Sequence, residues 1–496
     1  MKASTPAYLH LMRQAITETI APELSSEDAK RSAHILLGAI DDLLKRETVM
    51  PGVLANAIPQ GIDIARRLFV RLDQAGLKPD HGLLNQLDAI DGAIKGSSLA
   101  QLRANTLAVE AVLESLMLPF LSGKNNNDLA ASLAEVGEWK RTVLTQQLAP
   151  LPPVSTQAVV LKPLTAEKLR EFIRFCVPDD PNIEVLDFYA LPGGMSKQTY
   201  LFKLKRDDGR IEEMVARKDP SDPYLDFGCF NILREFEFAR VLFDQGLPVP
   251  EPLWVARDFA EVSGKFFVMR RVAGSNTGSI FSSAAIEESI LLQIAEALAR
   301  LHRTPLTAFA KFIERHKDKA LLSETASQST RRYLLDLIAA REKAIRTPDS
   351  GETFLLAWAL ANVPENDSPP VPIHGDFTPH NCLWHEGKVT SVIDWECGDF
   401  GDPVTDLAYL QPHIASRMDW DKFLNHYEQH LGRKVNRASF SYYAMFLHLR
   451  TSVILNVIST RIENRQAANV VALNIDYEYV PNLAKLCLDG ALAKAS

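Results

Sequence analysis

The sequence predicts an α+β protein, in which an all-α helical bundle precedes a small mixed β lobe and a larger helical lobe. Three observations predict this order. Apolar residues recur at helical spacing over the first 148 residues, short extended runs crowd residues 183–270, and helical periodicity returns after residue 280. The chain has 496 residues, more than one hydrophobic core usually supports, so we expect more than one domain.

Composition and charge narrow the class of protein. Hydrophobic residues make up 46% of the chain, as in soluble globular proteins, and the net charge is −8. Lysine and arginine are spread along the sequence, which argues against a nucleic-acid or membrane-surface partner. The five cysteines are widely spaced without a CxxC pair, so we expect no disulfide framework and a cytoplasmic location. The N-terminus lacks a secretory apolar core, and no segment approaches the roughly 20 apolar residues that span a bilayer.

The first 148 residues predict a helical bundle. Between residues 33 and 44 apolar side chains fall on one helical face, after serines that can cap the helix. Further amphipathic stretches lie near residues 53–75, 83–94, 99–121 and 128–147. Each such face needs another helix to cover it, so a bundle is the natural solution. Prolines and β-branched residues at 149–163 indicate an interdomain linker.

Residues 164–274 predict the small lobe. The runs IEVLDFYAL and TYLFKLKR are separated by PGGMSKQ, which is typical of a hairpin, and EEMVARK forms a third strand. The segment ILREFEFARVLFDQG predicts a helix, and LWVARDF and KFFVMRRV predict two more strands. Helices then dominate residues 275–496, interrupted by short strands and loops around residues 371–400.

That interruption holds residues with chemistry. Asp376 and Asn381 in HGDFTPHN stand five apart, and Asp394 lies thirteen further on, at the end of an apolar strand. Phosphoryl transfer from ATP needs a carboxylate near the acceptor hydroxyl, oxygen ligands for Mg²⁺ and a positive group at the phosphates. A kinase catalytic loop supplies the carboxylate from an Asp and a metal ligand from an Asn five residues on, and a second Asp supplies another ligand. The sequence offers the same residue types at this spacing.

These motifs, followed by GDPVTDLA, resemble the aminoglycoside phosphotransferase family of small-molecule kinases, which have a bilobal protein-kinase-like fold. The resemblance implies ATP and Mg²⁺ as cofactors. It implies that Asp376 is the catalytic base or orients the acceptor, and that Asn381 and Asp394 bind Mg²⁺. It also implies that His374 and Asp406 support the loop and the lobe.

The same template places the nucleotide in the small lobe. Gly193, Gly194 and Ser196 of PGGMSKQTY would approach the phosphates closely. The adenine ring would hydrogen-bond the main chain from Met269 to Arg271, where the two lobes are hinged.

A basic residue of the third strand completes the nucleotide site. Arg217 occupies the place of the usual phosphate-contacting lysine, and Glu235 is its expected helix partner. Because side chains alternate along a strand, Lys218 lies on the opposite face and is the alternate.

Several acidic and histidine side chains could either bind a metal or have a structural role. A zinc site from His374, His380, His385 and Asp376 competes with the magnesium site, although hard oxygen ligands favour Mg²⁺. The segment after Asp394 contains Glu396 and Asp399, which could assist the metal or hold the turn. Asp402 and Asp406 are expected as caps and hydrogen-bond acceptors, and His302 as a buried structural histidine.

The phosphate acceptor should be a small molecule. Asp406 follows Asp394 by only 12 residues, too few for the long segment that docks peptides in protein kinases. The stretches GGMSKQTY, GLPVPEPLW and FVMRRVAG resemble the branch related to kinase domains fused to acyl-CoA dehydrogenases. That likeness implies a hydroxyacyl-CoA substrate, such as a 4-hydroxyacyl-CoA.

Two other functions stay open. The first is transfer to an aminoglycoside, macrolide or amino alcohol. The second is a nucleotide-binding pseudokinase scaffold, against which the presence of Asp376, Asn381 and Asp394 argues. The N-terminal bundle is a candidate accessory or homo-oligomerisation domain.

Overall fold

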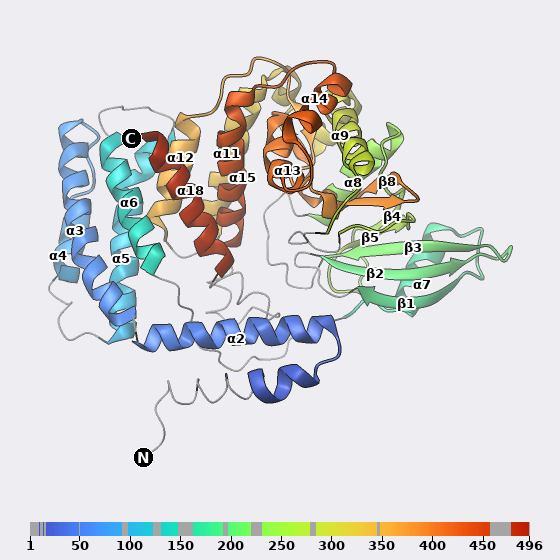
Figure 1. Ribbon diagram of the computed structural model, residues 1–496, viewed down its shortest axis with the longest axis horizontal. Coiled ribbons are helices and arrows are strands. Elements are labelled where there is room, and N and C mark those ends of the chain that lie inside the picture. The colour runs from blue at the N-terminus through green and yellow to red at the C-terminus, as the bar shows by residue number, and fades with distance from the viewer. Residues whose placement is uncertain are drawn as a thin grey trace. The chain divides into compact units, whose positions relative to one another are not determined.

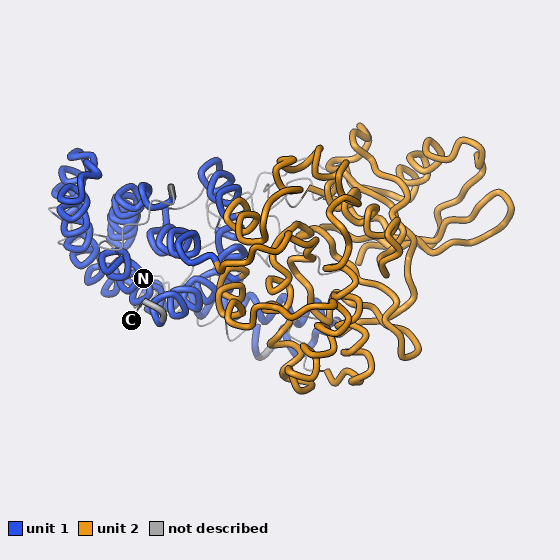
Figure 2. The backbone as a smooth tube through the Cα atoms, turned by 90° about the horizontal axis from the view of Figure 1, so that it is seen from above, with its two compact units in different colours: residues 1–157, 334–363, 448–496 blue, residues 158–333, 364–447 orange. Residues whose placement is uncertain are grey.

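The computed structural model describes residues 9, 13, 16–48, 50–91, 98–122, 130–146, 162–191, 197–219, 231–277, 284–344, 348–456 and 478–495. The chain divides into two compact units (Figure 2). Unit 1 contains residues 1–157, 334–363 and 448–496, and unit 2 contains residues 158–333 and 364–447. The described elements of unit 1 are helices, whereas unit 2 combines sheets with helices, so the expected α+β class is confirmed.

The contents of the units differ from the expected domain bounds. The expected bundle was 1–148, with a linker at 149–163, and the break at residue 157 lies inside that linker. Residues 334–363 and 448–496, however, were expected in the helical lobe and lie in unit 1. Helical periodicity predicts an apolar face without saying which unit will cover it.

Unit 1 is a bundle made from distant parts of the chain. Its main described helices are α2 (Glu27–Thr48), α3 (Met50–Gln74), α4 (Gly82–Asp91), α5 (Leu99–Met117), α6 (Ala130–Gln146), α12 (Ser350–Ala361) and α18 (Val480–Ala495). Helix α6 packs against α3, α12 and α18 (Figure 1). A Cβ on Gly61 would lie 2.6 Å from the Trp139 indole, and one on Gly137 would lie 2.9 Å from the Phe354 ring. Two glycines therefore allow these helices to approach closely.

Helix α5 requires a correction to the expectation about membrane spans. The helical segment Leu99–Leu121 is long and apolar enough to cross a bilayer, judged by length and composition alone. However, 61% of its most apolar 18-residue stretch is buried in the protein. The buried face of α5 also carries Glu110 and Glu114. Buried acidic residues with partners are typical of a core helix. The core helix of a globular protein can also be long and apolar enough to meet the length and composition criteria for a membrane span.

The acidic residues of α5 belong to a buried charge network. Lys140 of α6 lies 2.6 Å from Glu110 and 3.1 Å from Asp349, and its side chain is only 8% exposed. Burial lowers the pKa of Lys140, but the two carboxylates outweigh burial and raise it. Glu110 also accepts a hydrogen bond of 2.7 Å from the backbone N–H of Ser350. One ammonium group thus joins α5, α6 and the start of α12.

We expect Lys140→Met to destabilise unit 1 by about 3–5 kcal/mol, because it leaves two buried carboxylates without their cation. The loss should appear as a lower free energy of unfolding in urea denaturation. Lys30→Met is the matched control, since Lys30 is half exposed in its pair with Glu27 and should change stability by less than about 0.5 kcal/mol. Equal losses in the two variants would contradict the network's role.

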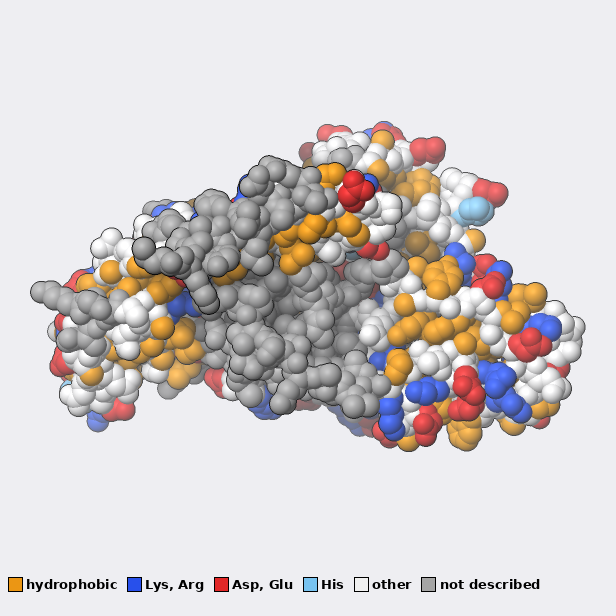
Figure 3. Space-filling view, turned by 90° about the horizontal axis from the view of Figure 1, so that it is seen from below, with side chains coloured by type: hydrophobic (Ala, Val, Ile, Leu, Met, Phe, Trp, Pro, Cys, Tyr) orange, Lys and Arg blue, Asp and Glu red, His pale blue; other side chains and the backbone are white. Residues whose placement is uncertain are grey.

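Unit 2 begins with a five-stranded antiparallel sheet in the order β1-β2-β3-β5-β4. Its strands are β1 (Glu184–Leu191), β2 (Gln198–Lys205), β3 (Ile211–Lys218), β4 (Pro252–Ala256) and β5 (Phe266–Arg270). Helix α7 (Ala166–Cys176) packs on β1, and α8 (Ile232–Asp244) packs on β4 and β5. From β1 to β5 the small lobe has the element order that the sequence predicts, whereas helix α7 before β1 was not predicted. Where described residues form the face shown in Figure 3, acidic and basic side chains intermingle.

The helical part of unit 2 surrounds two small sheets. Its helices are α9 (Glu288–Arg303), α10 (Ala310–His316), α13 (Val404–Ala415) and α14 (Trp420–Leu431). Helices α11 (Ala326–Lys343) and α15 (Phe440–Leu455) are each divided between the units. Strand β6 (Val371–Ile373) pairs with β9 (Asp399–Gly401), and β7 (Cys382–His385) pairs with β8 (Lys388–Val392).

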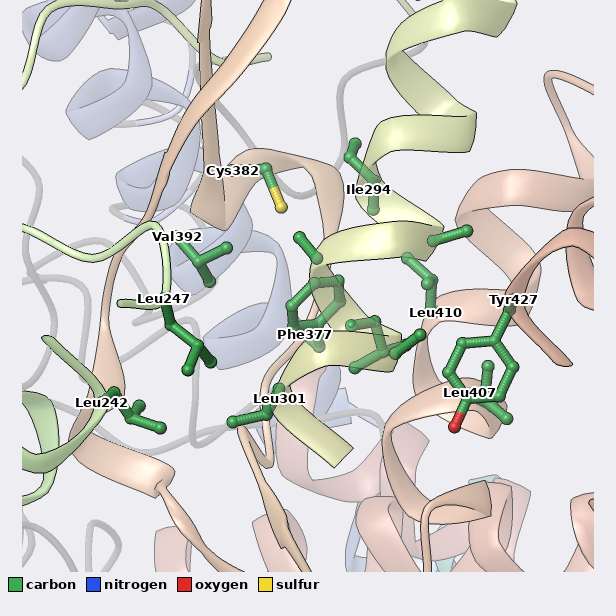
Figure 4. Packing of buried hydrophobic residues seen from close by; sticks show 14 of the residues in the cluster. Leu242, Leu247, Ile294, Leu301, Phe377, Cys382, Val392, Leu407, Leu410 and Tyr427 are labelled. Carbon is green, nitrogen blue, oxygen red and sulfur yellow. The ribbon is translucent and has the colours of Figure 1, made fainter. Parts of the chain in front are cut away.

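An apolar core anchors the catalytic segment. Phe377, inside HGDFTPHN, is buried among Leu301, Leu407 and Leu410 (Figure 4). Cys382 and Val392, from the hairpin that follows, join the same cluster. The polar residues on either side of Phe377 are therefore fixed to a rigid base.

Candidate active site

A short loop between β6 and β7 carries the first half of the site. Asn381 donates hydrogen bonds from Nδ2 to the backbone oxygen of Asp376 at 2.9 Å and to its carboxylate Oδ2 at 3.0 Å. The backbone oxygen of Asn381 accepts a 2.8 Å bond from the N–H of Ile393. The loop is thus tied to the residue before Asp394. Because Nδ2 makes both side-chain bonds, Oδ1 is the atom of Asn381 suited to a cation.

Asp394 supplies the second half. It follows β8 with a left-handed backbone, at φ 68° and ψ 58°. This conformation is uncommon for a residue other than glycine and is concentrated at functional sites. Its carboxylate accepts a 2.7 Å hydrogen bond from Arg217, and its side chain keeps 31% exposure. The carboxylate of Asp394 is therefore both fixed and accessible.

A buried relay holds the catalytic loop from behind. The carboxylate of Asp406 accepts bonds of 2.7 Å from the N–H groups of His374 and Gly375. It also accepts a 3.1 Å bond from His302 Nε2, and His302 Nδ1 lies 2.7 Å from the hydroxyl of Tyr427. Burial raises the pKa of Asp406. The hydrogen bond and the electrostatic interaction with His302 lower it by more, so the pKa lies below its usual value. His302 and Asp406 thus lie where a supporting role requires.

His374 has both ring nitrogens engaged. Nε2 donates to the backbone oxygen of Ile393 at 2.9 Å, and Nδ1 accepts from the N–H of Asp376 at 3.2 Å. A backbone carbonyl can only accept and an N–H can only donate, so the ring is the neutral Nε2–H tautomer. His374 joins the two halves of the site and has no nitrogen left for a metal.

Strand β3 brings Arg217, and not Lys218, to these residues. Arg217 forms an ion pair of 2.8 Å with Glu235 of α8 in addition to its bond with Asp394. Burial lowers the pKa of Arg217, but Glu235 and Asp394 raise it above its usual range. Lys218 points to the other side of the strand, where its ammonium donates to the backbone oxygen of Asp219 at 2.8 Å. The alternation of side chains along β3 therefore places Arg217 beside Asp394 and Lys218 on the opposite side of the strand.

Lys197 is a site residue that the sequence analysis did not single out. It lies just before β2, its side chain is 3% exposed, and its ammonium is 3.0 Å from Asp219 and 3.8 Å from Glu396. Burial lowers its pKa, but Glu396 and Asp219 raise it. Its position in PGGMSKQTY, beside the expected phosphate loop, was the available indication.

The charges around Arg217 favour a divalent cation. The carboxylates gathered there belong to Asp219, Glu235, Asp394 and Glu396. Among the described residues, Arg217 and Lys197 are the cations that form ion pairs with them. Burial, with the charges of Asp394 and Glu396, raises the pKa of Glu235 to about 7 despite Arg217. An excess of oxygen donors and negative charge fits Mg²⁺.

The sequence Asp399-Phe400-Gly401 is the same as the metal-binding DFG motif of protein kinases. It does not occupy the position of that motif, because the expected metal ligand is Asp394, five residues earlier. Asp399 is buried in ion pairs of 3.2 Å with Arg234 and 2.8 Å with Lys317. It holds the turn, whereas Glu396 faces the site through Lys197. Of the two roles considered for these acids, Asp399 therefore fits holding the turn, and Glu396 lies closer to the metal site.

Comparisons with known proteins identify the family of the chain. The phosphotransferase enzyme family matches residues 187–443, just over half of the 496 residues. The chain belongs to that family. It is 33% identical over 202 residues to acyl-CoA dehydrogenase family member 11 of Mus musculus, covering 40% of this chain and 24% of that protein. It is 29% identical over 182 residues to viomycin phosphotransferase of Streptomyces vinaceus, covering 34% and 56%.

One solved relative is a thermostable mutant of an aminoglycoside phosphotransferase in complex with AMP-PNP and hygromycin B. It is 15% identical and covers 66% of this chain and 99% of its own, with a TM-score of 0.42. The present chain spans about a quarter of the length of the mouse relative. The chain is thus a member of a family of phosphotransferase enzymes.

In this phosphotransferase the adenine contacts expected from Met269 to Arg271 stay a prediction, and two of the backbone donors there are already bonded. The N–H of Arg270 donates to Glu251 at 3.0 Å, and that of Arg271 donates to Glu213 at 2.9 Å, so these donors are committed to the sheet. Met269 lies inside β5, paired with strands on both sides. The first N–H beyond the sheet is that of Val272, and we move the expected contact there. The expected phosphate-loop residues Gly193, Gly194 and Ser196 lie outside the described residues.

The competing zinc site does not form in the described part of this phosphotransferase. His380 contacts Thr378 through Nδ1, and burial lowers its pKa to about 4. His385 is 56% exposed in the hairpin that follows. Across the described residues, neither these histidines nor Asp376 belong to a group whose ligand atoms converge on one ion.

Proposed function

We propose that the chain transfers the γ-phosphoryl group of ATP, with Mg²⁺, to the hydroxyl of a hydroxyacyl-CoA such as a 4-hydroxyacyl-CoA. One observation supports the chemistry above the others: Asn381 is bonded to Asp376 in one loop, and the backbone of that loop is bonded to the residue before Asp394, whose accessible carboxylate pairs with Arg217. We place the reaction in the cytoplasm.

In this proposal each side chain has one task. Asp376 orients the acceptor hydroxyl and takes its proton, and the bond from Asn381 sets the direction of its carboxylate. Asn381 Oδ1 and the carboxylate of Asp394 would hold Mg²⁺, which would neutralise charge on the transferred group. Arg217 would contact the phosphates and is itself held by Glu235. Relay residues Asp406 and His302 keep the loop in place.

Two observations support a small acceptor and a CoA thioester. Helix α13 begins at Val404, soon after Asp394, which leaves no room for a peptide-docking segment. The mouse relative is named as an acyl-CoA dehydrogenase family member, and such a protein handles CoA thioesters. An antibiotic acceptor is the second candidate, because viomycin phosphotransferase is also a relative.

An acceptor panel tests the proposal. The purified chain is incubated with γ-labelled ATP, Mg²⁺ and one of three acceptors: 4-hydroxyacyl-CoA, the same acyl-CoA without the hydroxyl, or viomycin. We expect label on the hydroxyacyl-CoA alone. Label on viomycin with none on the thioester would replace the proposed acceptor. Binding of Mg-ATP without transfer across a broad panel would instead support a pseudokinase.

A further inference from the structure

A second group of metal-ligating side chains lies on helices α9 and α14 of unit 2. Glu296 of α9 and two histidines of α14, His426 and His430, bring one ligand atom each within 4.8 Å of one another. None of the three belongs to the phosphoryl-transfer site described above. All three are half-buried, so solvent and ions can reach them.

The separations of their ligand atoms suit a tetrahedral transition metal. His426 Nε2 lies 2.9 Å from Glu296 Oε1, and His430 Nε2 lies 3.8 Å from the same oxygen. Ligand atoms each about 2.0–2.2 Å from a tetrahedral ion are about 3.3 Å apart, between these two values. Histidines at i and i+4 project from the same side of a helix, which allows both rings to face one ion.

Hydrogen bonding already prepares one ring. His430 Nδ1 lies 2.9 Å from the backbone oxygen of His426 and must donate to it, because a carbonyl oxygen only accepts. Nε2 of His430 therefore carries the lone pair, and this is the nitrogen nearer Glu296. Metal-binding histidines are commonly held this way, with the second nitrogen donating to a carbonyl or carboxylate.

We propose that Glu296, His426 and His430 bind one divalent transition metal ion of the Zn²⁺ class, which links α9 to α14. Two imidazoles and one carboxylate favour such an ion over Mg²⁺ or Ca²⁺, which prefer oxygen ligands. The fourth position is left to water. On binding, the proton on His426 Nε2 leaves that nitrogen: a neutral ring carries it on Nδ1 instead, and a protonated ring releases it to solvent.

The position of the site gives the ion a consequence. His302 lies on α9 and Tyr427 lies on α14, next to His426, and these two residues form the relay that ends at Asp406. An ion that joins the two helices would brace the support of the catalytic loop. It would act through the fold, without touching the phosphates.

Metal titration of the full chain tests the proposal. The protein is stripped with chelator and titrated with Co²⁺ in excess Mg²⁺, so that Mg²⁺ occupies the oxygen-rich site. We expect one Co²⁺ per chain with the visible absorption of tetrahedral nitrogen and oxygen ligation, displaced by Zn²⁺. Zn²⁺ should raise the melting temperature by about 5 °C and slow hydrogen exchange in α9 and α14.

Variants assign the site. His430→Ala should abolish the Co²⁺ spectrum, while His385→Ala, at an exposed histidine of the β7–β8 hairpin, should bind like the wild type. Glu296→Gln removes a ligand charge with little change in size and decides the question if His430→Ala fails to fold. Binding that survives both substitutions, or a wild-type chain that binds no Co²⁺, would overturn the proposal.

Discussion

Asp376→Asn should lower kcat about 10²–10⁴-fold, because the amide cannot take the proton of the acceptor hydroxyl. Nucleotide affinity should change little, since Asp376 faces the acceptor in the proposed arrangement. The measurement is phosphate transfer under saturating ATP and acceptor, together with nucleotide binding by calorimetry. The substitution keeps the size of the side chain, and the hydrogen bond from Asn381 to the backbone oxygen of Asp376 remains possible.

Asp421→Asn is the matched control for this change. Asp421 is an exposed residue of α14, paired with Arg437 at 2.6 Å, and its loss should leave kcat within about twofold. A rate in Asp376→Asn that equals the wild-type rate would remove Asp376 from the chemistry. A fall in both variants would point to general damage instead.

Arg217→Met should lower kcat/KM by about 10²–10³-fold, the usual effect of losing one preorganised positive group. It removes the cation that holds Asp394 and leaves Glu235 buried without its 2.8 Å partner. Arg217→Lys keeps the charge but loses the fork that contacts both acids, so it should restore activity only in part. Steady-state kinetics with varied ATP would separate loss of binding from loss of turnover.

Lys218→Met is the internal control, one residue away on the same strand. Lys218 is buried on the opposite side of β3 and bonds to Asp219 and Gln198, away from Asp394. We expect kcat/KM within about threefold of the wild type, with any loss in stability seen by thermal unfolding. Reversed effects at 217 and 218 would show that Lys218 contacts the phosphates. Circular dichroism of Arg217→Met checks that the variant is folded.

The spacing of Asp376, Asn381 and Asp394 predicted that they converge, and the structure bonds Asn381 to Asp376 and to the residue before Asp394. The alternation of a strand likewise separated Arg217 from Lys218. Lys197 was not predicted, since its role depends on Glu396 and Asp219, which only the tertiary structure brings close. The hinge contact stays a prediction, and its exact position depends on where β5 ends, which a sequence gives only to within a residue or two.

Long-range partners were beyond a single sequence. The i, i+4 spacing of His426 and His430 is visible there, but Glu296 lies 130 residues before His426. Helix α12 is apolar on nearly every side, and its sequence does not say whether α5 and α6 or the neighbouring helices of unit 2 will cover it. Burial depends on the partner, and the partner is chosen by the whole fold.

The threading of the chain through its two units has a consequence for how it folds during synthesis. Unit 2 has all its residues once the ribosome has added position 447, whereas unit 1 lacks residues 448–496 at that moment. Helix α6 is made early, but the side of it that packs against α18 stays uncovered until α18 has been made. Domains usually fold in the order in which they emerge. Here the unit that begins to emerge before unit 2 is completed after it, so the nascent bundle exposes apolar surface on α6 until α18 (Val480–Ala495) has been made.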